Sequence, residues 1–133
     1  MPLTLSAVTY LVNDYGEAIH WFTQALGFQL LEDTDMGGGK RWVRVAASDK
    51  GTSFVLGKAA DSAQQQAITN AAGGRVAFFL HTDDFAKTHQ RMTRAGIKFR
   101  EQPRHESYGT VAVFEDLYGN GWDLIGPVQT GKG

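Results

Sequence analysis

The chain repeats one short pattern of residues about seventy positions apart. The first copy spans residues 12–28 and the second spans residues 82–97. Each copy follows an apolar segment, places Asp at a turn, continues as about three turns of helix and ends at Gly27 or Gly96. A repeat of this kind predicts two related halves of one domain, with a seam between them where a ligand can sit.

Length and composition restrict the chain to a few classes of protein. Its 133 residues have the size of a single domain, and 42% hydrophobic residues are enough for a core. Thirteen basic and fourteen acidic residues leave a net charge of −1, so the sequence predicts no nucleic-acid partner. The absence of cysteine excludes disulfides, thiolate metal ligands and a cysteine nucleophile. No signal peptide or membrane-spanning apolar run is recognisable, so we expect a cytoplasmic protein with no membrane partner.

Residue alternation and capping signals predict the same order of elements in both halves. Asp14 and Asp84 are expected to cap the two helices, and Glu17 completes a capping box with Asp14. The predicted strands cover residues 5–12, 28–33, 40–47 and 53–56, then 75–82, 97–100, 110–114 and 122–125. The fold class is therefore α+β, in a single domain of residues 1–127 with halves 1–57 and 75–127. The polar residues 58–74 are expected to link the halves, with room for one helical turn, and residues 128–133 to form a flexible tail.

The closing sequence from Phe114 to Ile125, FEDLYGNGWDLI, adds a more specific signal. With the two strand–helix–glycine copies, it resembles the vicinal oxygen chelate superfamily over residues 5–126. That superfamily includes glyoxalase I, bleomycin-resistance proteins, fosfomycin-resistance enzymes and extradiol dioxygenases. The resemblance implies two tandem βαβββ modules that form cupped, mixed β-sheets with helices packed outside, and a homodimer.

The resemblance also indicates where a metal ion would be bound. In metal-dependent members, the first and fourth strands of each half supply the ligands. The corresponding positions here are Ala7, Phe54 or Val55, Ala77 or Val76, and Asp123. A single carboxylate does not hold a catalytic ion against water, so we predict a metal-free protein without a cofactor. None of the four histidines lies two or four positions from another, although a relocated metal site stays open as an alternative.

Strand alternation predicts the side chains that line the cup. The predicted ligand-binding residues are Trp42, Arg44, Phe54, Arg75, Phe79, His81, Phe114 and Asp123. Aromatic walls with a few polar anchors suit a small planar ligand, and arginine suits a carboxylate or phosphate. In the opposing interpretation, Arg44 and Asp123 pair across strands and the aromatic rings fill the cup. His105 and Tyr108 lie in a loop that is either a lid or a plain surface turn set by its proline and glycine.

The sequence therefore predicts a metal-free, dimeric small-molecule-binding protein similar to the bleomycin-resistance branch, with an aromatic or anionic ligand. The alternative is a lyase, isomerase or dioxygenase of the same superfamily. Its catalytic candidates are His81 and Asp123, either with a metal ion or with His81 as a metal-free base. A third possibility is a non-catalytic interaction module whose own side chains fill the cup.

Overall fold

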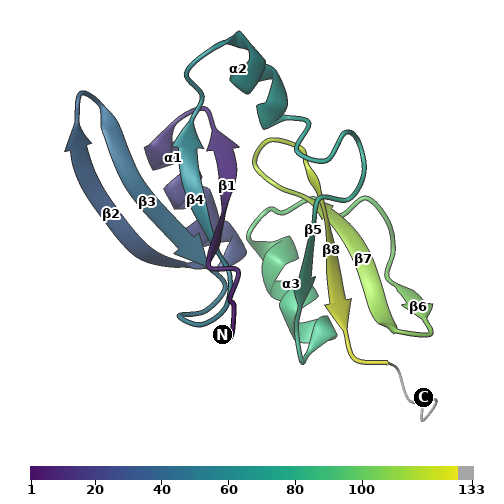
Figure 1. Ribbon diagram of the computed structural model, residues 1–133. Helices are drawn as coiled ribbons and strands as arrows, with labels where there is room; N and C mark the ends of the chain where they lie inside the picture. The colour runs from purple at the N-terminus through teal and green to yellow at the C-terminus, as the bar shows by residue number, and fades with distance from the viewer. Residues whose placement is uncertain (129–133) are drawn as a thin grey trace. The chain divides into compact units, whose positions relative to one another are not determined.

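The computed structural model describes residues 1–128. Residue contacts divide the chain into two compact units: unit 1 is Met1–Thr69, and unit 2 begins at Asn70. Each unit contains a four-stranded mixed β-sheet with an α-helix against one face (Figure 1). The predicted α+β class with two βαβββ modules is confirmed. Within the described residues, no helix is long and apolar enough to cross a membrane.

Unit 1 starts with a strand and a helix, followed by three strands and a second helix. Its elements are β1 (Ala7–Val12), α1 (Tyr15–His20), η1 (Trp21–Leu26), β2 (Gln29–Gly37), β3 (Lys40–Ala46), β4 (Ser53–Lys58) and α2 (Ser62–Ile68). The strand order is β1-β4-β3-β2, with β1 and β4 parallel and the other neighbours antiparallel. The helix α2, longer than the predicted single turn, forms within the expected linker 58–74 and packs on β1.

The first helix begins and ends at the predicted residues. The Asp14 carboxylate accepts a hydrogen bond from the Glu17 backbone N–H at 2.8 Å, and Gly27 ends the helix with a φ of +87°. The helix widens to a π-helix over η1. Its buried stripe meets the strands in an aromatic cluster, where the Phe22 ring lies 5.1 Å from Tyr10 and 5.8 Å from Phe54 between centroids. This cluster is the core of unit 1.

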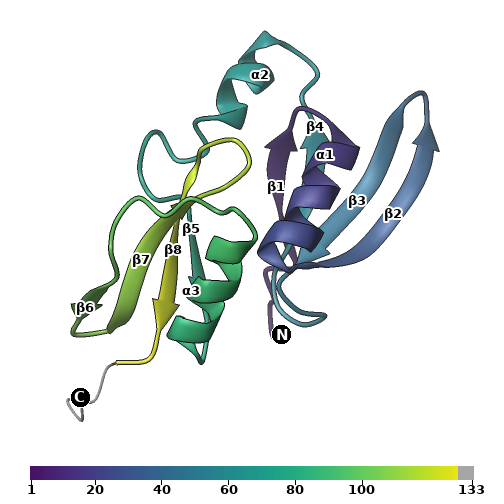
Figure 2. The same ribbon diagram turned by 180° about the vertical axis from the view of Figure 1, so that it is seen from behind.

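Unit 2 repeats the topology, with a shorter first and a shorter second strand. Its elements are β5 (Phe78–His81), α3 (Phe85–Arg94), β6 (Arg104–Glu106), β7 (Gly109–Glu115) and β8 (Gly121–Gly126). The strand order is β5-β8-β7-β6, with β5 and β8 parallel. Figure 2 shows α3 along one face of this sheet. The Asp84 carboxylate caps α3 as predicted, accepting from the Lys87 N–H at 3.1 Å.

Three predicted segments of unit 2 differ from the structure. The strand expected over 97–100 is reduced to a single bridge between Phe99 and Phe114, and β6 forms instead within the expected loop. The strand expected from residue 75 begins at Phe78, because Arg75 belongs to a turn in which its N–H donates to the Ala72 carbonyl at 3.2 Å. Residues 129–133 of the predicted tail lie outside the described residues, and Val128 is exposed.

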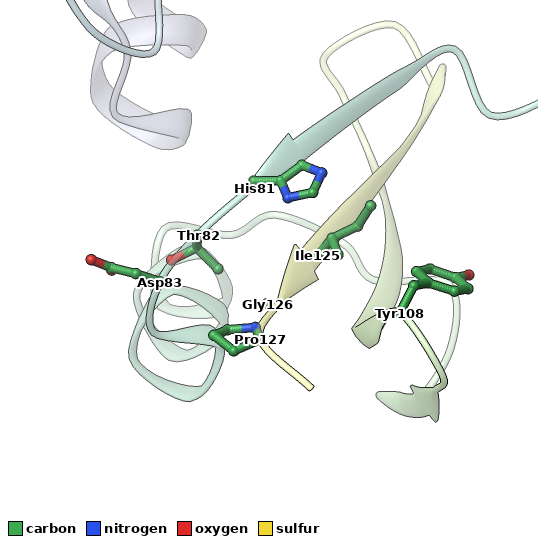
Figure 3. A pocket seen from close by; sticks show the side chains of 7 residues that line it. All are labelled: His81, Thr82, Asp83, Tyr108, Ile125, Gly126 and Pro127. Carbon is green, nitrogen blue, oxygen red and sulfur yellow. The ribbon is translucent and has the colours of Figure 1, made fainter. Parts of the chain in front are cut away.

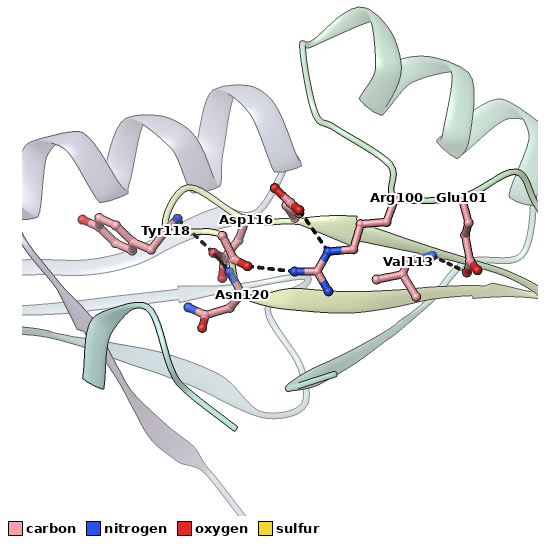
Figure 4. Close-up of polar contacts among 8 residues, drawn as sticks. Arg100, Glu101, Val113, Asp116, Tyr118 and Asn120 are labelled. Carbon is pink, nitrogen blue, oxygen red and sulfur yellow. Dashed lines mark hydrogen bonds and ion pairs between the residues drawn. The ribbon is translucent and has the colours of Figure 1, made fainter. Parts of the chain in front are cut away.

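The closing sequence motif forms a turn held by one buried carboxylate (Figure 4). Asp116 Oδ1 accepts from the backbone N–H groups of Tyr118 and Asn120 at 2.9 and 3.0 Å. Its Oδ2 accepts from Trp122 Nε1 at 2.9 Å. On the outside of the turn, the Arg100 guanidinium binds Glu115 at 3.0 Å and the Gly119 carbonyl at 2.9 Å. The motif therefore fixes the β7–β8 connection and the start of β8.

Candidate functional site

Cross-strand pairing determines which side chains of unit 2 point away from α3, because paired residues of neighbouring strands share a face. Phe78, Trp122 and Phe114 are aligned on the face that packs on α3. The neighbouring row, Phe79, Asp123 and Val113, must therefore point to the other side. We call this side the distal face of unit 2; it carries Phe79, His81, Val111, Val113, Asp123 and Ile125.

The distal face places a buried carboxylate beside an exposed aromatic ring. Phe79 is 63% exposed, whereas its cross-strand neighbour Asp123 is 8% exposed. Asp123 Oδ1 is buried and has no hydrogen-bond partner among the described residues. Burial raises the pKa of the Asp123 carboxyl above its ordinary value; Arg104 opposes this shift and Glu101 adds to it. The carboxylate is thus desolvated, and its Oδ1 is an acceptor without a donor among the described residues.

The guanidinium of Arg104 lies on the same side of the sheet, since Arg104 pairs with Val111. It forms ion pairs with Glu106 at 2.6 Å and Glu101 at 3.1 Å. The hydrogen bonds that the guanidinium donates to Glu106, Tyr108 and Glu101 raise the pKa of Arg104. The sequence analysis did not consider Glu101, although an acidic residue three positions before Arg104 is a recognisable charge pattern. Because Arg104 is held by two carboxylates, it is not a free anchor for an anion.

A cavity of about 740 Å³ opens at the end of the β5–β8 pair. It is lined by His81, Thr82, Asp83, Tyr108, Ile125, Gly126 and Pro127. Figure 3 shows His81 and Ile125 projecting to the same side of the strands, with Tyr108 beyond them. The volume is within the range of small-molecule sites. Of the predicted residues, His81 and Tyr108 line this cavity, whereas Phe79 and Asp123 form the cross-strand pair two residues earlier on the same face of β5 and β8.

The corresponding side of the unit 1 sheet contains a closed polar network. Trp42 and Arg44 share the face that points away from α1, as strand alternation predicts. The Arg44 guanidinium binds Glu32 at 2.6 Å and Ser53 Oγ at 3.2 Å, and Trp42 Nε1 donates to Glu32 at 3.2 Å. These bonds lower the pKa of Glu32, the Arg44 bond most strongly. Glu32 thus takes the role of ion-pair partner that the sequence analysis considered for Asp123.

Two of the aromatic side chains predicted to line the ligand site, Phe54 and Phe114, lie on the helix side of their sheets instead. Phe54 packs in the aromatic cluster around Phe22, and Phe114 is fully buried against Phe99 and Trp122 on the α3 side. The expectation that these two rings line a ligand site is therefore incorrect. Their strand neighbours Val55 and Val113 point away from the helices, on the same sides as Arg44 and Asp123. The reason is that the large rings fill the space between sheet and helix better than valine does.

Two further predicted residues are also placed differently from expectation. Arg75 is exposed in the turn before β5, so strand alternation does not place it on the sheet. His105 lies in β6 opposite Thr110, and its Nδ1 is 3.2 Å from Thr110 Oγ1. Because Arg104 occupies the distal side of that strand, His105 points the other way. Of the two residues proposed for a lid, only Tyr108 contributes to the cavity.

The positions expected for metal ligands do not form a metal site. The first-half positions carry Ala7 and Val55, and in the second half Ala77 donates its N–H to the Gly121 carbonyl at 2.8 Å. Asp123 is the one carboxylate among them. Nowhere in residues 1–128 do three or more His, Asp or Glu side chains gather in a group that could hold a metal ion. These residues do not fit the divalent centre of the metal-dependent enzymes.

Comparisons with known proteins agree with the fold. A sequence model of the Glyoxalase/Bleomycin resistance protein/Dioxygenase superfamily matches residues 4–124. An uncharacterized protein from Shewanella frigidimarina (strain NCIMB 400) is 47% identical over 127 residues, covering 94% of either chain. Among solved structures, UcmS2 is 31% identical with a TM-score of 0.80, over 94% of this chain and 98% of its own. TnmS3, an antibiotic binding protein from Streptomyces sp. CB03234, is 25% identical with a TM-score of 0.72, over 96% and 97%.

Proposed function

The chain belongs to the Glyoxalase/Bleomycin resistance protein/Dioxygenase superfamily, and from this premise we propose that it binds an aromatic small molecule on the distal face of unit 2, without a metal ion. The similarity to TnmS3, an antibiotic binding protein, supports a binding role. The proposed site consists of the Phe79 ring and the Asp123 carboxylate, together with the cavity lined by His81 and Tyr108 at the end of the same strands. Binding without chemical conversion would make the protein a carrier or sequestering protein.

The observation that carries this proposal is the unpartnered Oδ1 of Asp123. A buried acceptor without a partner costs about 1–3 kcal/mol, and the described residues supply no compensating donor. A ligand O–H or N–H group would satisfy the oxygen, while its ring packs on the exposed Phe79 beside it. Binding would thus relieve the free-energy cost of the unpaired oxygen in the ligand-free protein, and this relief would add to the affinity for the ligand.

The charges on this face favour a hydrogen-bond donor over an anion. Asp123, Glu101 and Glu106 surround the single guanidinium of Arg104, which is already ion-paired. An anionic group next to Asp123 would meet like charge and find no unpaired arginine. Of the two ligand classes expected from the sequence, an aromatic molecule with a phenolic, amide or amine donor is the better match for this face.

Calorimetry and NMR titration with a matched pair of probes test the proposal. We expect 2-naphthol to bind more tightly than 2-methoxynaphthalene, which lacks the donor, and to shift the backbone amides of Phe79 and Asp123. Asp123→Asn removes the charged acceptor and should weaken 2-naphthol about tenfold or more. Leu30→Ala, a truncation of an exposed apolar residue in unit 1, is the matched control and should leave binding unchanged. Equal affinity for the two probes would contradict the proposed role of Asp123.

Metal dependence is tested separately on the same purified protein. We expect elemental analysis to find no divalent ion at one per chain, and Ni²⁺, Zn²⁺, Mn²⁺ and Fe²⁺ to leave the melting temperature unchanged. A tightly held ion, or a melting temperature raised at micromolar metal, would favour the lyase, isomerase or dioxygenase alternative.

The assembly and location of the protein are part of the same proposal. We propose a cytoplasmic homodimer, and the membership of the superfamily supports the dimer. Light scattering coupled to size-exclusion chromatography should give twice the chain mass of 14.6 kDa. A monomer over the micromolar range would rule the dimer out.

A further inference from the structure

The sheet of unit 1 is open between its two central strands. The paired register of β3 and β4 covers only Arg44 with Val55 and Val45 with Phe54. The flanking ladders are much longer, since β1 pairs with β4 as far as Lys58 and β2 pairs with β3 as far as Lys40. Figures 1 and 2 both show the β2–β3 hairpin curving away from β4 towards its tip. The strands therefore form a wedge that is closed at one end and open at the other.

A cavity of about 710 Å³ fills this wedge. Its walls include the Trp42 indole, the Met36 thioether and the Val55 side chain, and Trp42 and Met36 are 41% and 59% exposed. Gly38 and Gly39 of the hairpin tip also line it, and a Cβ added to either would meet no atom within 4 Å. The volume and the flat apolar wall suit a molecule of one or two fused rings.

The charged residues that line the wedge are all cations. Lys40, Arg41 and Lys58 line the cavity, and no acidic residue does. Arg41 is neutralised by Asp33 at 2.7 Å, but neither lysine has an ion-pair partner among the described residues. At the inner wall, the hydroxyl of the buried Tyr15 accepts from the Arg41 backbone N–H at 3.3 Å. Nothing in the described part of the chain accepts the hydrogen of that hydroxyl.

We infer that the wedge between β3 and β4 is a second binding site, specific for an aromatic anion such as an aryl carboxylate or sulfonate. The ring would lie against Trp42 and Met36, and the anionic group would face Lys40 and Lys58. This polarity is opposite to that of the distal face of unit 2, where carboxylates predominate. The inference uses no residue of the Asp123 site and does not depend on the function proposed for it.

An NMR titration with 2-naphthoate and its neutral analogue 2-naphthamide tests the inference. The indole N–H signal of Trp42, assigned with Trp42→Phe, reports on the wedge directly. We expect 2-naphthoate to shift this signal and to bind about tenfold more tightly than 2-naphthamide. The double variant Lys40→Gln/Lys58→Gln should reduce the affinity for 2-naphthoate to that for 2-naphthamide, because two exposed charges together account for about a factor of ten.

Two controls separate this site from general surface effects and from the Asp123 site. Lys50→Gln/Lys98→Gln removes two exposed lysines that do not line the cavity and should leave the affinity for 2-naphthoate unchanged. Asp123→Asn should also leave it unchanged while weakening 2-naphthol. Equal affinities for naphthoate and naphthamide, an unmoved Trp42 signal, or an equal loss in the two lysine pairs would each overturn the inference.

Discussion

Replacing Asp123 with valine should stabilise the protein and abolish ligand binding on the distal face of unit 2. The carboxylate is 8% exposed, and one of its oxygens has no partner in residues 1–128. Removing such an acceptor recovers about 1–3 kcal/mol. The attraction between Asp123 and the partly exposed Arg104, worth up to about 1 kcal/mol, is lost in exchange. Valine suits a β-strand beside Val113, so we expect a net gain of about 1–2 kcal/mol in the free energy of unfolding at pH 7.

The pH dependence of this gain tests its cause. Because burial raises the pKa of Asp123 in the folded protein, the folded state holds the proton more tightly than the unfolded state. The wild type therefore loses stability as the pH rises from about 4 through the folded-state pKa, and Asp123→Val does not undergo this loss. Urea unfolding followed by tryptophan fluorescence should give a larger difference at pH 8 than at pH 4. A valine variant that is less stable than the wild type, or an advantage independent of pH, would refute the reasoning.

Three further substitutions test the packing that positions the site. Asp116→Ala removes the acceptor for two backbone N–H groups and for Trp122 Nε1, and should lower the free energy of unfolding by about 2–4 kcal/mol in urea titrations. Gly126→Ala would place a Cβ 2.6 Å from the Phe85 Cβ of α3, so we expect a loss of about 1–3 kcal/mol by the same assay. Phe79→Ala truncates a 63% exposed ring and should change stability by less than about 0.5 kcal/mol while weakening 2-naphthol; a large loss of stability would mean that the ring is structural.

Features that depend on neighbouring residues in the sequence were predictable. Asp14 and Asp84 cap their helices because the side chain of each reaches a backbone N–H three positions later. Gly27 ends its helix because a left-handed residue is needed there. Strand limits in unit 2 were less accessible. Both segments lie against β7, but 97–100 forms a single bridge with it despite its strand-like residues, whereas 104–106 pairs with it over three residues and becomes a strand.

The candidate site was predictable only in part, because alternation alone does not tell which face of a strand meets the helix. The predicted sharing of a face held for Trp42 with Arg44 and for Phe79 with His81. It failed for Phe54 and Phe114, whose rings complete the helix-side cores. Nor did the sequence show which charges neutralise each other. The glutamate that occupies Arg44 is twelve positions away and meets it only across the β2–β3 ladder.

The two units share a topology but differ in whether their polar side chains have hydrogen-bond partners. This difference supports a ligand site in unit 2. On the side of the unit 1 sheet that points away from α1, hydrogen bonds of 2.6–3.2 Å join Glu32, Arg44, Ser53 and Trp42. On the distal face of unit 2, Arg104 forms ion pairs with Glu101 and Glu106, whereas the buried Asp123 has an oxygen without a hydrogen-bond partner among the described residues. A carboxylate kept only for folding would be expected to have a donor, or to be replaced by an apolar residue, because either change lowers the cost of burial. The unsatisfied oxygen beside an exposed ring is therefore better explained by a partner from outside the chain.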